Sequence, residues 1–174
     1  IYDLFEDSRY QHLESIKNDI QVNSAAIYRR ITREDNYRTG GLVLNDDWSV
    51  SILDNENNKI KLSLVSSGTK ECVALSIYAG LFQAIGKDRA FIGDSIFGRL
   101  DYVHKTNILN HADKFGSQLI LFLTSSEHAD IGLMQNSLEW NTLRINKKPS
   151  GEAEFAKADL NKMDEERIRT IKGD

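Results

Sequence analysis

The sequence predicts an α/β domain in which helices flank a parallel sheet. Two short segments, 90–93 (AFIG) and 118–124 (QLILFLT), are almost entirely apolar, and a helical pattern separates them. Strands that are apolar on both faces, with helices between them, are typical of a parallel sheet covered on both sides. A helical pattern and then alternating apolar residues come earlier in the chain, so a long helix and a β-hairpin should precede the sheet.

The composition is that of one ordinary globular domain. The chain has 174 residues, of which 40% are hydrophobic and 28% charged, which is enough for a sizeable core. No stretch approaches the roughly 20 apolar residues of a membrane span, and the start has neither an initiator Met nor a signal peptide. We therefore expect a part of a longer cytoplasmic protein with no membrane contact.

Charge and cysteine content narrow the function further. The formal net charge of −4 argues against a mainly DNA-binding surface, because phosphate contacts require clustered Lys and Arg. Contact with nucleic acid must be local or supplied elsewhere. The single cysteine, Cys72, lies within an apolar helical pattern and is expected to be a buried structural thiol in a reducing compartment.

The first element, residues 1–38, is predicted to be a helix. Residues 3–37 contain no Gly or Pro, and apolar residues recur at alternating three- and four-residue steps, with Asn23 in the seam: Leu13, Ile16, Ile20 and Ile27. This pattern fits the end of a coiled coil and, equally, an amphipathic helix packed on its own domain. Gly40 and Gly41 end the helix.

The remaining elements follow from changes in period. A hairpin is predicted by two alternating runs on either side of the turn 54–58 (DNENN): Trp48, Val50 and Ile52, then Ile60, Leu62 and Leu64. A helix is predicted by a broad apolar stripe: Val73, Ala74, Ile77, Tyr78, Leu81, Phe82 and Ile85. We further expect a helix over 101–115, a strand within 139–146 and a charged surface helix over 156–171. The predicted division is 1–38, 39–155 and 156–174.

The segment 90–104 (AFIGDSIFGRLDYVH) contains two overlapping motifs. Its G-D-S offers Ser95 as a nucleophile, with a D-x-x-H pair at Asp101 and His104. In serine esterases of the G-D-S type, however, that pair lies far along the chain, whereas here Asp101 follows Ser95 by six positions. A short loop would have to fold back to bring the three side chains together, so the esterase is a remote alternative.

The other motif agrees with its neighbours. In 64–81 (LVSSGTKECVALSIYAGL), a strand leads through Ser66, Ser67 and Gly68 into a helix, which presents backbone N–H groups to an anion. This stretch resembles the L-S-x-G-x-K signature motif of ABC-type ATPases of the SMC and SbcC-like group, with Val65 in place of Leu. About twenty residues later, 90–94 (AFIGD) resembles the Walker B strand and 97–101 (FGRLD) the D-loop that follows it, in the expected order and spacing.

Within this group the chain most resembles the DndD subfamily, the SMC-like ATPases of DNA phosphorothioation systems. The similarity lies in 94–104 (DSIFGRLDYVH) and 117–127 (SQLILFLTSSE), where Thr124 and Glu127 match the switch segment and Ser125 replaces an Asp. The resemblance spans residues 60–128. It implies a role in DNA modification, antiviral defence or repair, with an associated nuclease or modification protein as partner.

The resemblance also implies roles for individual residues. Asp94 would hold the water shell of Mg²⁺ on bound ATP, and Ser95 stands where most members have the Glu that polarises water. Glu127 is the best remaining carboxylate for aligning the attacking water. Ser125 and His128 are weaker candidates for the switch position that senses the γ-phosphate. Purely structural roles stay open as alternatives: Asp94 as a loop cap, Ser66 as a helix cap, and Glu127 as an exposed glutamate at a helix start.

The signature residues Ser66, Ser67, Gly68 and Lys70 would meet the γ-phosphate of ATP bound to a second head, with the D-loop residue Asp101 between the two sites. A P-loop reads G-x-x-x-x-G-K-[ST]. The nearest string, from Gly80 to Gly86, Lys87 and Asp88, has one residue too many and ends in Asp.

The chain is therefore expected to be the C-terminal lobe of a split P-loop ATPase head. Its partners would be its own N-terminal Walker A lobe, a second head and, through the complete protein, DNA. A structural head that dimerises without hydrolysing ATP is the nearer alternative, because Ser95 replaces the usual Glu.

Overall fold

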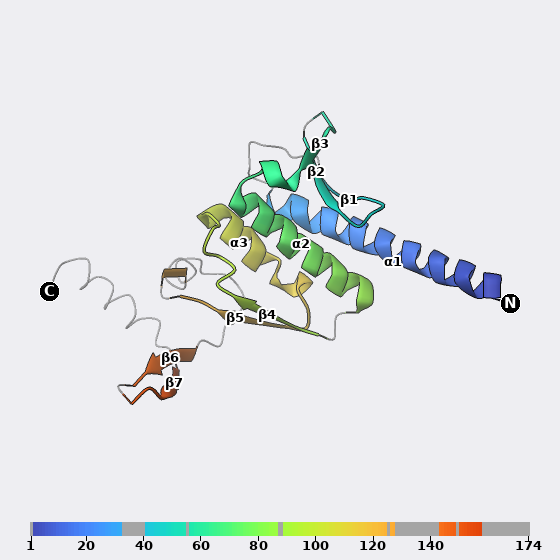
Figure 1. The fold of residues 1–174 in the computed structure, drawn as a ribbon. Helices are drawn as coiled ribbons and strands as arrows, with labels where there is room; N and C mark the ends of the chain where they lie inside the picture. Colours follow the sequence, from blue (N-terminus) through green and yellow to red (C-terminus); the bar gives the residue numbers. More distant parts are fainter. Residues whose placement is uncertain are drawn as a thin grey trace. The chain divides into compact units, whose positions relative to one another are not determined.

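The computed structural model describes residues 2–32, 41–54, 56–86, 89–124, 126–127, 143–148 and 150–157. The chain forms two compact units, 1–127 and 128–174. Figure 1 shows the elements in chain order: α1 (Tyr2–Ile31), β1 (Gly41–Leu44), β2 (Val50–Leu53), β3 (Lys59–Lys61), η1 (Leu62–Leu64), α2 (Ser67–Ile85), β4 (Ala90–Asp94), α3 (Tyr102–Asn110), η2 (Ala112–Lys114), β5 (Gln118–Phe122), β6 (Leu143–Lys147) and β7 (Ala153–Lys157).

The first helix is predicted correctly as an element, and its two halves differ. In the C-terminal half, Ile20, Ile27 and Ile31 are buried against the rest of the unit. In the N-terminal half, Tyr2 and Leu13 are exposed, and α1 extends past the end of α2 (Figure 1). The C-terminal half is thus an amphipathic helix packed on its own domain. The helix ends at Ile31, and residues 33–40 lie outside the described part of the chain.

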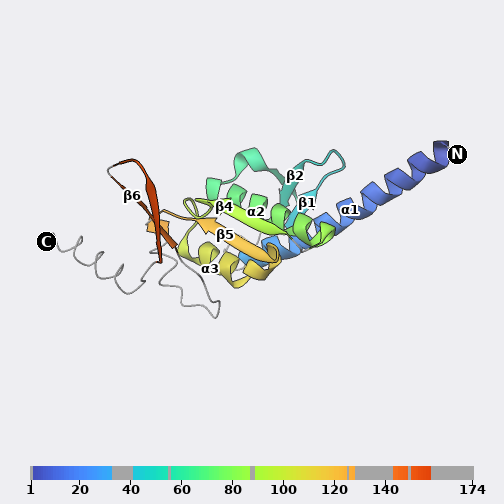
Figure 2. The same ribbon diagram turned by 90° about the horizontal axis from the view of Figure 1, so that it is seen from below.

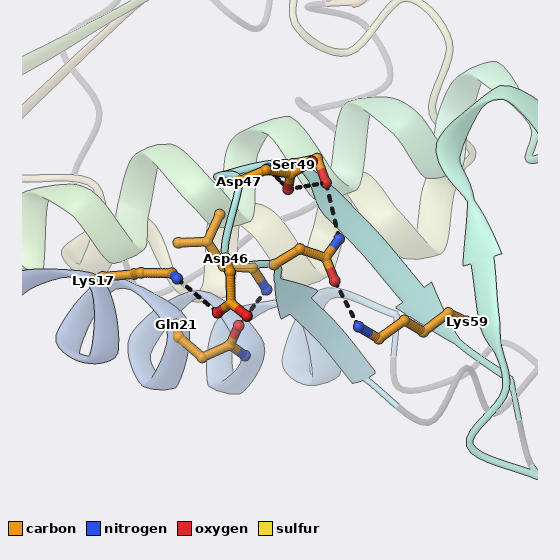
Figure 3. A network of polar contacts seen from close by, with 8 residues as sticks. Lys17, Gln21, Asp46, Asp47, Ser49 and Lys59 are labelled. Carbon is orange, nitrogen blue, oxygen red and sulfur yellow. Dashed lines mark hydrogen bonds and ion pairs between the residues drawn. The ribbon is translucent and has the colours of Figure 1, made fainter. Parts of the chain in front are cut away.

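Polar side chains tie α1 to the neighbouring sheet (Figure 3). The Gln21 side chain donates to the Leu42 carbonyl oxygen at 2.7 Å and accepts from the Leu44 N–H, so it satisfies the backbone of β1 as a neighbouring strand would. Lys17, itself buried, forms an ion pair of 3.1 Å with Asp46. These contacts hold the sheet and the helix together as one body.

The predicted hairpin is part of a three-stranded sheet, and its strands are shorter than expected. β2 and β3 pair antiparallel as predicted, and β1, a strand that was not predicted, pairs with the other edge of β2. Three residues predicted to lie in strands do not: Trp48, Leu62 and Leu64. Trp48 lies in the turn before β2 with φ 63°, and Leu62–Leu64 form a 3₁₀ helix that redirects the chain toward α2.

The parallel pair is present as predicted. β4 and β5 pair in parallel from Ala90 opposite Gln118 to Asp94 opposite Phe122. Phe91 packs edge-to-face on Tyr78 and Phe82 of α2 and on Phe115, with ring centroids 5.3–6.2 Å apart. Helices α2 and α3 lie on the same side of the two strands (Figures 1 and 2).

The expected cover on both faces was wrong for the described residues. Ile92, which points away from Phe91, is 64% exposed, because α2 and α3 both pack on the opposite side. Alternation on β4 therefore separates a buried face from an open one.

The second unit contains the hairpin of β6 and β7. The strand expected within 139–146 is confirmed in part by β6, which begins at Leu143. The helix expected from residue 156 was wrong at its start, because Ala156 and Lys157 pair in β7; residues 158–174 lie outside the described part. The predicted division at residues 38 and 155 stays a prediction. Among the described residues, no helix is long and apolar enough to cross a bilayer.

Candidate functional site

The start of α2 presents backbone donors to solvent. Ser66 is the N-cap: its hydroxyl accepts from the Thr69 N–H at 3.1 Å and lies 2.8 Å from the Thr69 hydroxyl. The Lys70 N–H donates to the Ser66 carbonyl oxygen. The N–H groups of Ser67 and Gly68 come first in the helix and have no acceptor within it, which makes this end suitable for an anion. The cap role predicted as the alternative for Ser66 is thus present, and it leaves these two donors available.

The loop 95–101 packs directly on this helix start. A Cβ added to Gly68 would lie 2.9 Å from the Arg99 carbonyl oxygen, closer than side chains normally approach. Within the loop, Phe97 and Leu100 are buried, and Leu100 donates its N–H to the Phe97 carbonyl oxygen. Position 68 therefore requires glycine, because a side chain there would prevent the loop backbone from lying against the helix. The two motifs form one surface.

Asp94 ends β4 at the carboxyl edge of the parallel pair, where ligands bind in open α/β sheets. Its side chain is exposed. The next residue, Ser95, has φ 50° and donates its N–H to the Phe122 carbonyl oxygen at 2.9 Å, so the chain turns sharply just after the carboxylate. The Ser95 hydroxyl lies 3.4 Å from Asp94 Oδ1.

An exposed carboxylate at a fixed strand end fits a hydrated Mg²⁺, which is held by oxygen ligands and usually keeps several waters. Among the described residues no group of three or more His, Cys, Asp and Glu could enclose a metal ion by itself. A metal at Asp94 would take its other ligands from water and the nucleotide. The donor set therefore fits a metal that arrives with a triphosphate.

Glu127 is buried, with 5% of its surface exposed, so the alternative of an exposed glutamate at a helix start is wrong. One carboxylate oxygen accepts from the Thr124 N–H at 2.9 Å and from the Thr124 hydroxyl at 2.8 Å. The Thr124 hydroxyl in turn accepts from the Glu127 N–H, which completes a capping box. The other oxygen accepts from the Phe97 N–H at 3.2 Å. Glu127 thus joins the end of β5 to the loop after Asp94; its role in aligning water stays a prediction.

Glu71, one turn into α2, is a charged group at the site that was not predicted from the sequence. It lines a groove together with Gly93, Asp94 and Ile96, and its Oε2 is buried without a hydrogen-bond partner among the described residues. Burial raises the pKa of the Glu71 carboxyl, as does the charge of Glu127, while Arg99 opposes the shift. The available signal was a glutamate immediately before the apolar stripe of a helix.

Asp101 is the N-cap of α3, accepting from the His104 N–H at 2.9 Å, and its carboxylate also lies 2.8 Å from His104 Nδ1. Partial burial works to raise the pKa of Asp101, but the hydrogen bonds and charge of His104 outweigh it, so that pKa is lowered. The described contacts pair His104 with Asp101 and the Ser95 hydroxyl with Asp94, which gives the esterase no support. The switch candidates Ser125 and His128 lie outside the described residues.

The string that imitates a P-loop is confirmed not to be one. Gly80 lies inside α2, with its backbone in helical hydrogen bonds, and Gly86 follows directly after the end of that helix. A phosphate cradle requires a loop whose N–H groups converge on the anion, which a helix interior does not provide.

No protein-family model and no curated protein matches the sequence. Solved structures do match in fold. A chain from work on ATP-driven dimerisation and DNA-stimulated activation of SMC ATPases aligns with a TM-score of 0.66 at 16% identity, over 92% of this chain and 96% of that one. The Smc head domain with coiled coil and joint from Pyrococcus yayanosii gives 0.68 at 12% identity, over 97% and 32%.

The SMC head domain from Thermotoga maritima gives a TM-score of 0.54 at 15% identity, over 86% of this chain and 52% of that one. The chain thus spans nearly all of the first structure but about a third and a half of the other two. This chain has the α/β fold of SMC ATPase head domains.

Proposed function

We propose that this chain is the C-terminal lobe of an SMC-like ATPase head, and that ATP-driven dimerisation and hydrolysis by the complete protein act on DNA. The observation that carries the proposal is the contact between Gly68 and the Arg99 carbonyl oxygen, which joins the start of α2 to the loop after Asp94. The signature and D-loop resemblances therefore fall on one surface. The likeness in fold to SMC heads supports the same assignment.

In this proposal, Asp94 holds the water shell of a Mg²⁺ ion bound to ATP. The metal and nucleotide, when bound, supply the electrophilic phosphoryl group and neutralise its charge. The chain's own contribution is a carboxylate fixed at the end of β4, because the Ser95 N–H anchors the backbone to Phe122 immediately beyond it. A rigid ligand loses little freedom when the metal binds.

The start of α2 faces a second head. The N–H groups of Ser67 and Gly68 and the positive end of the helix dipole would receive the γ-phosphate bound on that head, with Ser66 shaping the turn. Lys70 is exposed one turn further and adds positive charge to the same end. Asp101, at the far end of the packed loop, would lie between the two sites.

The missing phosphate cradle would come from an N-terminal Walker A lobe. No P-loop motif occurs in the 174 residues. We expect residues 1–174 alone to bind ATP negligibly, as measured by calorimetry, and to gain micromolar binding only with that lobe. Micromolar affinity of this chain by itself would contradict the two-lobe arrangement.

A structural head that dimerises without turnover is the second candidate. Ser95 occupies the position of the usual Glu, and both oxygens of Glu127 already accept hydrogen bonds from Thr124 and Phe97. These observations favour slow or absent hydrolysis.

The matches of 94–104 and 117–127 to the DndD subfamily support a role in DNA modification or defence, with an associated nuclease or modification protein.

One experiment separates the candidates. The complete protein is mixed with MgATP, with and without DNA, while light scattering follows dimerisation and a phosphate assay follows turnover. Dimers with phosphate release support the ATPase, and dimers without release support the structural head. Monomers that hydrolyse a nitrophenyl ester without ATP would instead identify an esterase.

A further inference from the structure

Asp101 and His104 form a hydrogen-bonded pair at the start of α3. Their D-x-x-H spacing places them at the N-cap and the third position of α3, so both lie at the start of one helix. The His104 side chain is 13% exposed, whereas that of Asp101 is 62% exposed. A largely buried ring therefore supports a carboxylate that faces outward.

The direction of the hydrogen bond follows from the chemistry of the pair. The lowered pKa of Asp101 keeps its carboxyl ionised, and an ionised carboxylate can only accept hydrogen bonds. His104 Nδ1, 2.8 Å from Oδ1, must therefore carry the proton. The same oxygen accepts the His104 backbone N–H at 2.9 Å. An ordinary N-cap needs only the backbone bond; the ring adds a second restraint on the side chain.

The backbone that leads to Asp101 is also fixed. Arg99 lies with its carbonyl oxygen against Gly68, and Leu100 is buried. The carboxylate of Asp101 is thus held from both directions, by the start of α2 through the backbone and by His104 through the side chain. Its position relative to Ser66 and Gly68 is set before any partner arrives.

We propose that His104 is a positioning residue for head dimerisation, holding the Asp101 carboxylate in the orientation in which it meets the second head. This inference rests on the proposed function. A preorganised side chain loses less conformational freedom on binding than a mobile one. Loss of the ring donor should therefore weaken the ATP-dependent dimer about two- to tenfold per head contact, while each head still binds nucleotide normally.

The test compares two substitutions in the full-length protein. His104→Phe keeps a ring but removes the donor, whereas His104→Asn keeps an N–H donor close to the position of Nδ1. Sedimentation with a slowly hydrolysed ATP analogue gives the dimer dissociation constant, a fluorescent nucleotide gives binding to monomers, and thermal melting reports folding. We expect His104→Phe to weaken the dimer and His104→Asn to restore most of it, with nucleotide binding unchanged in both.

A second variant shows whether the effect passes through Asp101. In an Asp101→Asn background, which retains a good N-cap, His104→Phe should weaken the dimer no further. An unchanged dimer in His104→Phe, or a loss in both His104 variants that follows their melting temperatures, would overturn the inference and leave a purely structural cap. A wild-type protein that stays monomeric with the ATP analogue would overturn the proposed function itself.

Discussion

Gly80 of α2 lies directly against the backbone of Ser24 in α1. A Cβ on Gly80 would overlap the Ser24 hydroxyl and lie 2.7 Å from the Ser24 nitrogen and 3.0 Å from the Ile20 carbonyl oxygen. The two helices therefore cross backbone to backbone. Because α2 carries Ser66 and Gly68 at its other end, this crossing determines where those residues lie relative to α1.

The first prediction concerns this crossing. Gly80→Ala should destabilise the chain by about 1–3 kcal/mol through overpacking, although the same change in an exposed helix would stabilise it by about 1 kcal/mol. Urea denaturation measures the difference. Ser24→Ala is the matched control: the Ser24 hydroxyl is buried without a partner among the described residues, so its removal should not destabilise. A Gly80→Ala protein at least as stable as wild type would contradict the backbone contact.

The elements that could be predicted from the sequence are those set by local pattern. The apolar stripe of α2 has the period of a helix, and β4 and β5 are short apolar runs, so each element is recognisable from its own residues. β1 could not be predicted in this way. It has four residues, and its backbone bonds go to β2 and to the Gln21 side chain of α1, which are tertiary contacts.

The candidate site shows the same limit. Asp94 ends a strand and Ser66 caps the start of a helix, so the order of the motifs along the chain is enough to predict where both residues lie. Glu127 differs, because its burial depends on the Phe97 N–H thirty residues away. Burial of both faces of β4 was predicted because its residues are apolar on both faces. An apolar strand does not show, however, whether helices of the same chain pack on each face.

The second prediction concerns Glu71 and pH. Its pKa is raised above the ordinary 4.5, chiefly by burial, so the folded state holds the proton more tightly than the unfolded state. Below the ordinary pKa the carboxyl is neutral in both the folded and the unfolded state, so its burial does not reduce the free energy of unfolding. As the pH rises through the folded pKa, the buried carboxyl ionises and that free energy falls.

The free energy of unfolding of Glu71→Gln should therefore match that of wild type at about pH 3.5 and exceed it at about pH 7. Denaturation across this range measures it, with the exposed Glu56→Gln as control. A glutamine variant that is less stable than wild type only at neutral pH would show that Arg99 stabilises the ionised Glu71 carboxyl by more than burial destabilises it, which would contradict the prediction.

The third prediction separates Asp94 from Ser95 in the complete protein. Asp94→Asn should lower Mg²⁺-dependent turnover on the order of a hundredfold or more, because the metal loses its fixed carboxylate. Ser95→Ala should retain substantial activity, since the one contact of the hydroxyl among the described residues is a long one, 3.4 Å to Asp94. Phosphate release under saturating MgATP measures both. Equal damage from the two substitutions would give the serine a chemical role in turnover.

The fourth prediction tests whether the start of α2 receives the phosphate of a second head. Ser66 is exposed and shapes the turn before two N–H groups that α2 leaves unpaired. Ser66→Arg would place a long side chain across this end. Because nucleotide binding and dimerisation are linked through that phosphate, the variant should bind ATP on its own head yet fail to dimerise.

Light scattering with ATP, under conditions that slow hydrolysis, measures the Ser66→Arg dimer, and a fluorescent nucleotide measures binding separately. Ser66→Asn is the matched control, because Asn caps helices as well as Ser does and adds little volume. It should fold normally and retain most of the dimer, whereas Ser66→Arg should lose it. If Ser66→Arg dimerises as wild type does, no phosphate passes between the heads at this point, and residues 66–68 are only a helix cap.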